Sequence, residues 1–287
     1  MTDPIKLINV SHYYSQGLPV QVAAVKNINL TIKAGEAVGI IGHTGSGKST
    51  LISHFNGLLK PSEGTVLVDG EDIHKDKETL RRSRFKIGLC FQYPESQLFE
   101  ETVAKDIAFG PKNMGLSDSE IALRVERAAE FVGLKRELLS KSPFDLSGGE
   151  KRRAAIAGVM AMEPEVLVLD EPAAGLDPRG KNEILRMIMN YREQTGSTIV
   201  FVSHSMEDIA ATAERIIVMN HGEIALEGTV DEVFSHGESL RTMGLNVPEI
   251  TRIFMMLRQR GIDVPSNIYS VEEGARILRG LAERRRG

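Results

Sequence analysis

A glycine-rich stretch from residue 42 to residue 50 constrains the fold of this chain more than any other feature. It follows the apolar run 37–41 and precedes a helix-compatible segment that begins at Leu51. A strand, a glycine loop and a helix in this order are typical of a phosphate-binding P-loop. The stretch consists of Gly42, His43, Thr44, Gly45, Ser46, Gly47, Lys48, Ser49 and Thr50.

The chemistry of this loop predicts that it binds a nucleotide. Its glycines let successive backbone N–H groups point at a phosphate chain, and the start of the following helix adds a partial positive charge. We expect Lys48 to reach the β- and γ-phosphates and Ser49 to offer its hydroxyl to Mg²⁺.

Composition narrows the class of protein. The 287 residues suffice for one large domain and a smaller unit, and the net charge of −4 argues against broad nucleic-acid binding. The single cysteine, Cys90, excludes an intrachain disulfide framework and suits a reducing compartment. We find neither a secretory-signal pattern nor an uncharged apolar run of about 18 residues, so we expect any membrane role to come through a partner.

Short strand patterns on either side of the P-loop predict a small antiparallel sheet. They cover residues 5–10, 28–33 and 65–70, and a turn at 15–19 separates the first two. Tyr13 and Tyr14 precede this turn, and one of them could stack on an adenine base. On spacing alone, a half-buried strand tyrosine is an equally good interpretation.

Residues 85–91 predict a buried strand that ends at Gln92. Doubly wound folds bind their ligand at the carboxyl edge of the sheet, so Gln92 could bind Mg²⁺ or the attacking water there. From 102 to 139 the pattern becomes helical, and we expect residues 110–111 and Gly115 to break it into pieces. A separate helical subdomain is therefore predicted.

A second glycine-containing stretch, 146–153, opens a helix that continues through Ala161. Its two glycines permit close approach, and its free N–H groups can bind an anion. Because the P-loop already supplies one phosphate site, we expect this helix start to serve a nucleotide held by another subunit. The predicted contact residues are Ser147, Gly148, Gly149 and Glu150.

Two carboxylates follow the continuous apolar run 166–169, which is typical of a central parallel strand. Carboxylates at such a strand end are costly unless they meet a cation or a proton donor. We therefore expect Asp170 to bind Mg²⁺ through water and Glu171 to act as general base or to orient water.

A further buried strand at 198–202 ends at His204. This predicts that His204 lies at the same sheet edge as Lys48, Gln92 and Asp170. We interpret the other histidines as surface or filler residues.

Together these elements resemble the ATP-binding subunit of an ABC transporter. The P-loop, Gln92, the Leu-Ser-Gly-Gly stretch at 146–149, the pair 170–171, the loop at Asp177 and His204 occur in the order of that family. The family usually has glutamine where Glu150 stands. The resemblance implies that the protein hydrolyses ATP and uses Mg²⁺. It implies catalytic roles for Gln92, Glu171 and His204, and Mg²⁺ coordination by Ser49, Gln92 and Asp170. It also implies that Tyr14, rather than Tyr13, stacks on adenine.

The fold class that the resemblance implies is α/β. It comprises a P-loop NTPase core with a RecA-like parallel sheet, an antiparallel β subdomain and an ABC-type α-helical subdomain at about 95–162, all within an ATP-binding domain spanning 1–234. Residues 235–287 match a small C-terminal helical extension. There Ile250, Ile253, Phe254 and Leu257 form an apolar stripe, and Ser270 with Glu273 predicts the capping box of a second helix. The resemblance favours a dimerisation element here over simple packing on the main domain.

Residues 91–102 and 106–111 resemble, more narrowly, the energy-coupling factor branch of importers, which includes cobalt-type ATPases. Within that branch, residues 43–46 resemble the second of two paired ATPase subunits. The resemblance implies uptake of vitamins or transition-metal ions. It also implies three partners: a second ABC ATPase (a heterodimer is favoured over a homodimer), a transmembrane coupling subunit and a substrate-binding membrane subunit. The chain would then be peripheral, at the cytoplasmic face of the cell membrane, and would not bind nucleic acid.

The alternative is a soluble ABC ATPase that acts in DNA repair or translation without a membrane partner. Repair members usually carry a long coiled coil between the P-loop and the Leu-Ser-Gly-Gly stretch, whereas only about a hundred residues without heptads intervene here. Translation members usually hold two ATPase domains in one chain, and this chain has one P-loop.

Overall fold

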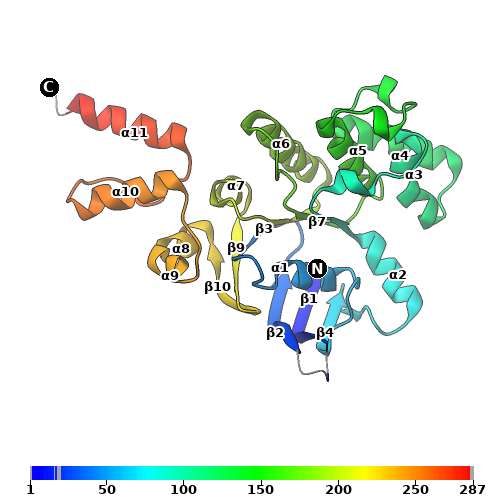
Figure 1. Ribbon diagram of the computed structural model, residues 1–287, viewed down its shortest axis with the longest axis horizontal. Coiled ribbons are helices and arrows are strands. Elements are labelled where there is room, and N and C mark those ends of the chain that lie inside the picture. The colour runs from blue at the N-terminus through cyan, green and yellow to red at the C-terminus, as the bar shows by residue number, and fades with distance from the viewer. Residues whose placement is uncertain (1, 16, 18–20, 285–287) are drawn as a thin grey trace.

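A mostly parallel sheet of six strands forms the centre of the fold (Figure 1). The computed structural model describes residues 2–15, 17 and 21–284. All neighbouring strands of this sheet pair in parallel except the last pair at one edge, which is antiparallel. In spatial order the strands are β10 (Glu223–Thr229), β9 (Arg215–Asn220), β3 (Ala37–Ile41), β8 (Thr198–Val202), β7 (Val166–Asp170) and β6 (Ile87–Cys90).

A second, antiparallel sheet confirms the prediction of a separate β subdomain. Its spatial order is β2 (Val22–Ile32), β1 (Ile5–Tyr14), β4 (Glu63–Val68) and β5 (Glu71–Asp72). The helix α1 (Lys48–Phe55) shares a core with both sheets, because Leu51, Ile52 and Phe55 are fully buried among strand residues of each. Residues 16 and 18–20 lie outside the described part of the chain, so the turn predicted at 15–19 stays a prediction.

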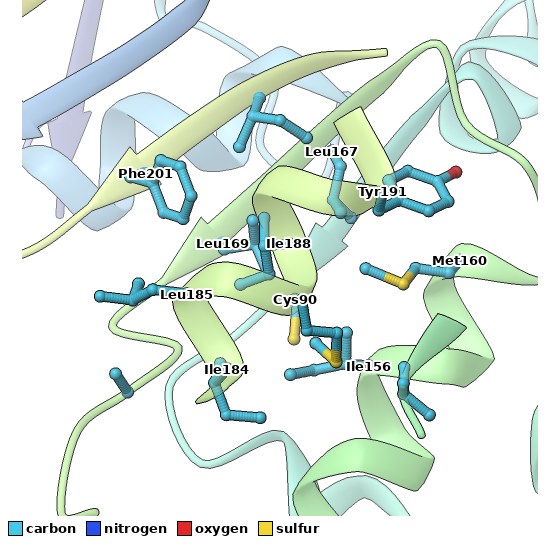
Figure 2. Close-up of a cluster of buried hydrophobic side chains, with 14 of the residues drawn as sticks. Cys90, Ile156, Met160, Leu167, Leu169, Ile184, Leu185, Ile188, Tyr191 and Phe201 are labelled. Atoms are coloured by element: carbon cyan, nitrogen blue, oxygen red, sulfur yellow. The ribbon is translucent and has the colours of Figure 1, made fainter. Parts of the chain in front are cut away.

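Helices cover the other face of the parallel sheet. Side chains of α6 (Pro178–Thr195) and α5 (Gly148–Met160) meet the strands in one apolar cluster, shown in Figure 2. Burial raises the pKa of the Cys90 thiol to about 12, so this cysteine is a small core residue, as the sequence predicts. The labelled members of the cluster are Cys90, Ile156, Met160, Leu167, Leu169, Ile184, Leu185, Ile188, Tyr191 and Phe201.

Apart from the strand β6, the regular elements between β5 and α5 are helical. One prediction fails at its start, because Phe85 and Lys86 end a helix and the strand begins only at Ile87. The elements are α2 (Lys77–Lys86), η1 (Pro94–Gln97), α3 (Val103–Met114), α4 (Asp118–Phe131), η2 (Arg136–Leu138) and η3 (Pro143–Asp145), the η segments being 3₁₀ turns.

The predicted break at residues 110–111 is also wrong, because both residues lie inside α3. Pro111 is part of the buried face by which this helix packs on α5. Gly110 permits that packing, since a Cβ atom there would lie 2.6 Å from Met162 Cγ. Tertiary contact thus outweighs the local cost of proline. Gly115 does end the helix, with a left-handed φ of 81°.

The C-terminal part adds α7 (Met206–Thr212), α8 (Val230–Ser235), α9 (Gly237–Thr242), α10 (Glu249–Gln259) and α11 (Val271–Arg284). The last two helices project at one end of the molecule (Figure 1) and have a small core of their own around Ile250 and Phe254. Ile253 is 41% exposed, so the predicted apolar stripe extends beyond this small core onto the surface. Ser270 accepts a hydrogen bond from Glu273 N, which caps α11 as expected. Within the described residues, no helix has both the length and the apolar character that a bilayer span needs.

The interpretation of the remaining histidines as surface or filler residues is wrong for His54. This side chain is fully buried in α1, and its Nδ1 lies 2.6 Å from the carbonyl oxygen of Thr50. Burial lowers the pKa of His54 from 6.5 to about 4, so the ring is neutral in the folded protein near pH 7.

We therefore expect a pH-dependent contribution of His54 to stability. Between about pH 6.5 and pH 4 the unfolded chain binds a proton that the folded chain does not, so this contribution is complete above pH 6.5 and is lost as the pH falls. The full loss is roughly 3 kcal/mol. Urea unfolding of the wild type and of His54→Leu across this range should show a smaller pH slope for the variant. The exposed His236→Gln serves as control, and an unchanged slope in His54→Leu would contradict the assignment.

Candidate nucleotide-binding site

The P-loop joins β3 to α1, and its glycines are required by close contacts. A Cβ at Gly42 would lie 2.4 Å from Ser46 Oγ. Gly47 has a φ of 104°, and a Cβ there would lie 2.3 Å from the carbonyl oxygen of Ala24. At Gly45 the space beyond the backbone is open. The loop therefore keeps its backbone accessible to a ligand, as a phosphate-binding loop must.

The ammonium group of Lys48 folds back onto the same loop. Its Nζ donates hydrogen bonds to the carbonyl oxygens of Gly42, at 2.7 Å, and of His43, at 3.1 Å. Burial lowers the pKa of Lys48, against the opposing effect of the carboxylates of Glu171 and Asp170. A cation is thus held at the mouth of the loop.

Ser49 and Asp170 connect the start of α1 to the end of β7. Ser49 Oγ donates to Asp170 Oδ2 at 3.2 Å. Burial raises the pKa of the Asp170 carboxyl, and the hydrogen bond from Ser49 counteracts this shift. A hydroxyl and a carboxylate oxygen at one point are hard ligands, so these residues fit Mg²⁺.

Glu171 is held by the end of β8. Its backbone N donates to Val202 O at 2.9 Å, and its own φ is 51°, which turns the chain sharply after β7. Its Oε1 accepts from the backbone N of His204 at 2.9 Å and lies 2.7 Å from the Nδ1 of that ring. Because a carboxylate can only accept, this contact places a proton on Nδ1 of His204.

A cavity of about 370 Å³ adjoins this pair. Its lining includes Gln92, Glu171 and His204, which come from the ends of three different strands. The structure therefore brings together the three residues that the sequence predicts to be catalytic.

The two neighbouring tyrosines differ in their surroundings. Tyr14 is 44% exposed, and its hydroxyl lies 3.3 Å from Thr50 Oγ1 on α1. Tyr13 instead lines a hollow of the antiparallel sheet, together with Asn9 and Glu63. Of the two tyrosines, Tyr14 is the one whose side chain forms a hydrogen bond with the P-loop helix among the described residues. This position is compatible with the prediction that Tyr14, rather than Tyr13, stacks on adenine.

The Leu-Ser-Gly-Gly stretch lies apart from the P-loop of the same chain. Helix α5, which it opens, sits in the helical group of Figure 1, well separated from α1. Ser147, Gly148 and Gly149 are all exposed, so this helix start faces solvent.

Glu150 has a contact that the sequence interpretation missed. Its Oε2 accepts from the backbone N of Ser147 at 2.9 Å and from Ser147 Oγ at 2.6 Å, which completes a capping box. Serine followed three residues later by glutamate is the sequence signal of this motif, and it was available. In this chain the carboxylate of Glu150 therefore supports the helix end. Asp177 likewise caps α6, accepting from Gly180 N at 2.7 Å.

Arg152 is a second residue that sequence reasoning missed. Its side chain is only 4% exposed, and its guanidinium makes a bidentate pair with Glu95 at 2.8 and 3.0 Å. It also donates to the carbonyl oxygens of Pro172 and Ala174, just after Glu171. One buried cation thus connects α5 to the segment after Gln92 and to the segment after β7.

Comparison with known proteins identifies relatives over nearly the whole chain. Residues 25–174 match the family "ABC transporter". The chain is 54% identical to the "Energy-coupling factor transporter ATP-binding protein EcfA2" of Caldanaerobacter subterraneus subsp. tengcongensis, over 96% of this chain and 98% of the relative. It is 52% identical to the protein of the same name from Clostridium perfringens, over 96% of each.

Solved structures agree with these relatives. The chain resembles cbiO1 of Clostridium perfringens, described as part of the ABC transporter complex cbiONQ, with a TM-score of 0.75 and 38% identity, over 90% of this chain and all of that one. It also resembles the ATP-binding cassette MJ0796, solved as a dimer bound to ADP and Pi, with a TM-score of 0.71 and 32% identity, over 79% of this chain and 98% of that one. These likenesses confirm the predicted ABC-type α/β fold.

We expect Arg152→Met to destabilise the protein by roughly 3 kcal/mol, because it leaves the carboxylate of Glu95 largely buried without its partner. Urea unfolding at neutral pH measures this loss. The matched control is Arg136→Met, which breaks an exposed pair with Glu126 and should cost less than about 1 kcal/mol. An equal loss of unfolding free energy in the two variants would show that the buried pair stabilises the protein no more than the exposed pair does.

Proposed function

Because the chain belongs to the ATP-binding subunits of energy-coupling factor transporters, a branch of the ABC transporter family, we propose that its ATPase activity drives the uptake of vitamins or transition-metal ions. The ATP is bound between this chain and a second ATPase subunit. The exposed Leu-Ser-Gly-Gly helix start, apart from its own P-loop, is the observation that carries the proposal.

The need for a second subunit follows from that separation. The described chain has one phosphate-binding loop, and the helix start capped by Ser147 is exposed and lies apart from that loop. If a second ATPase subunit packs against this chain in the opposite orientation, the helix start of each subunit lies at the P-loop of the other subunit. The dimeric relative MJ0796 supports this arrangement. We favour a heterodimer, because residues 43–46 resemble the second of two paired ATPase subunits and the relatives are named EcfA2.

Nucleotide binding in this proposal uses the P-loop and Tyr14. Backbone N–H groups of residues 42–50 and the ammonium of Lys48 hold the phosphates, and the Tyr14 ring stacks on adenine. Ser49, Asp170 and Gln92 are the proposed Mg²⁺ ligands. When bound, Mg²⁺ neutralises charge on the phosphate oxygens.

Hydrolysis requires that a water attack the γ-phosphorus while the bond to ADP breaks. Glu171 accepts the proton of that water, and the hydrogen bonds from His204 and Ser203 hold its carboxylate in place. Gln92 lines the same cavity and orients the water. Loss of the γ-phosphate removes the group that bridges the two subunits, so the pair opens.

An apolar groove on the helical group is the proposed site for the membrane partner. It is lined by Phe85, Leu98, Phe99 and Phe109, and Phe99 and Phe109 are 60% and 45% exposed. Their rings pack edge to face at 5.0 Å, which preforms the groove wall. A helix of the transmembrane coupling subunit, which itself holds the substrate-binding subunit, suits such a groove. The chain would thereby be held peripherally at the cytoplasmic face of the membrane.

The domain division that we propose places the ATP-binding domain at 1–234 and a dimerisation element at 235–287. The separate small core of α10 and α11 supports a distinct element from about residue 249 onward, whereas Leu240 and Leu245 pack in the core of the main domain. The exposed side chains of Ile253 and Met256 provide apolar contact area for dimerisation.

We predict that Glu171→Gln lowers the ATPase rate about 10²- to 10⁴-fold, because the amide cannot accept the proton of the attacking water. ATP binding should persist, and ATP should hold the paired subunits together. Phosphate release and ATP-dependent association by size-exclusion chromatography measure the two effects. Glu193→Gln, at an exposed site on α6, is the control. A near-normal ATPase rate in Glu171→Gln would refute the role of Glu171.

We predict that Phe99→Asp reduces recovery of integral membrane proteins with the tagged chain by about tenfold or more, because it places a charge in the groove. Purification from detergent-solubilised membranes followed by mass spectrometry measures this recovery. Leu123→Asp, at an exposed site on α4, is the matched control. Recovery of nucleic acid or ribosomes instead of membrane proteins would favour the soluble alternative.

A further inference from the structure

Two buried histidines, one on β1 and one on the P-loop helix, adjoin Tyr14. His12 on β1 is 9% exposed, and its ring centroid lies 4.9 Å from that of the fully buried His54 on α1. On its other side, His12 packs against Tyr14 at a centroid distance of 4.7 Å and an interplanar angle of 71°. The exposed tyrosine ring therefore rests on a buried support.

The hydrogen bonds determine the tautomers of both imidazoles. The carbonyl oxygen of Thr50 can only accept, so the contact at 2.6 Å places a proton on Nδ1 of His54. The pKa of His54, lowered to about 4 by burial, leaves its Nε2 unprotonated and able to accept. His12 Nδ1 then donates to that Nε2 at 3.2 Å, and the same hydrogen also faces Lys60 O at 3.2 Å.

These contacts form a closed ring. Thr50 binds His54 through its carbonyl, His54 binds His12, and His12 packs on Tyr14. The hydroxyl of Tyr14 returns to Thr50 Oγ1 at 3.3 Å. Thr50 directly follows the phosphate-contacting Ser49, so the ring ties the tyrosine to the P-loop helix at two points.

We propose that His12 and His54 are positioning residues that hold the Tyr14 ring at one orientation relative to the P-loop, so that base stacking and triphosphate binding occur together without further ordering. This inference rests on the proposed function of Tyr14 as the adenine-stacking residue. An exposed aromatic side chain otherwise loses rotational freedom when it binds a base, and a preformed orientation removes that cost.

The test compares Mg-ATP with inorganic tripolyphosphate, which lacks the base, by calorimetric titration. The full chain carries Glu171→Gln so that turnover does not interfere. We expect His12→Ala to weaken ATP binding about 3- to 10-fold and to leave tripolyphosphate binding within about twofold. His12→Phe keeps the ring contact with Tyr14 but loses the Nδ1 donor, so its loss should be smaller.

Two further variants separate this inference from its premise. If His12 acts through Tyr14, then Tyr14→Ala combined with His12→Ala weakens ATP binding no more than Tyr14→Ala alone. If Tyr14→Ala itself leaves ATP affinity unchanged, the proposed stacking role of Tyr14 fails. If Tyr14→Ala weakens ATP but His12→Ala does not, the positioning role alone is overturned.

A general structural defect gives a different result. Equal weakening of ATP and tripolyphosphate in His12→Ala would mean that the histidine merely supports the fold, and it would overturn the proposal. Thermal unfolding of each variant verifies that the protein is folded, and His12→Phe provides the comparison if His12→Ala is not. The exposed His236→Ala should change neither ligand.

Discussion

Parallel pairing of β3, β8 and β7 is the constraint on which the rest of the site depends. In a parallel sheet the carboxyl ends of all strands lie at one edge, and here each of these strands ends in a functional loop. The bond from Ser49 to Asp170 connects the loops after β3 and β7, and the bond from His204 to Glu171 connects those after β8 and β7. Ser49 and Asp170, which are 121 positions apart in the chain, thereby lie at one edge of the sheet.

Buried charge extends this edge into the helical group. Arg152 lies on α5, yet its guanidinium bonds Glu95 after β6 and two carbonyl groups after β7. The buried guanidinium needs all of these acceptors, because an N–H group that lost both water and a protein acceptor would carry an uncompensated desolvation cost. The helix that begins with Ser147 is therefore mechanically connected to the segments that carry Gln92 and Glu171. The Arg152–Glu95 pair thus connects the helical group that carries the groove near Phe99 to the segment that follows Glu171.

The same principle of mutual support applies on the opposite side of the P-loop. Tyr14 is exposed on one face and backed by His12 on the other, and His54 continues the contact into the core between the two sheets. An imidazole suits the position of His54 because its Nδ1 donates to Thr50 O and its Nε2 accepts from His12 Nδ1, two bonds that a phenylalanine could not make. The antiparallel sheet therefore does two things: it packs on α1, and it holds Tyr14 at a defined position beside the P-loop.

Local residue patterns in the sequence predicted most of the elements and the family of this protein. Glycine positions, apolar runs and the polar residues that follow them predicted the P-loop, the buried strand that leads to Asp170 and Glu171, the buried strand that leads to His204, the exposed helix start and the family, because backbone geometry and strand burial act locally on residue type. Contacts between distant segments establish that Pro111 stays within α3 and that Arg152, His12 and His54 are buried in hydrogen-bonded networks. The physical reason is that the cost of a buried charge, an unpaired imidazole or a helix-interior proline depends on partners supplied by distant segments, and no local pattern of residues specifies those partners.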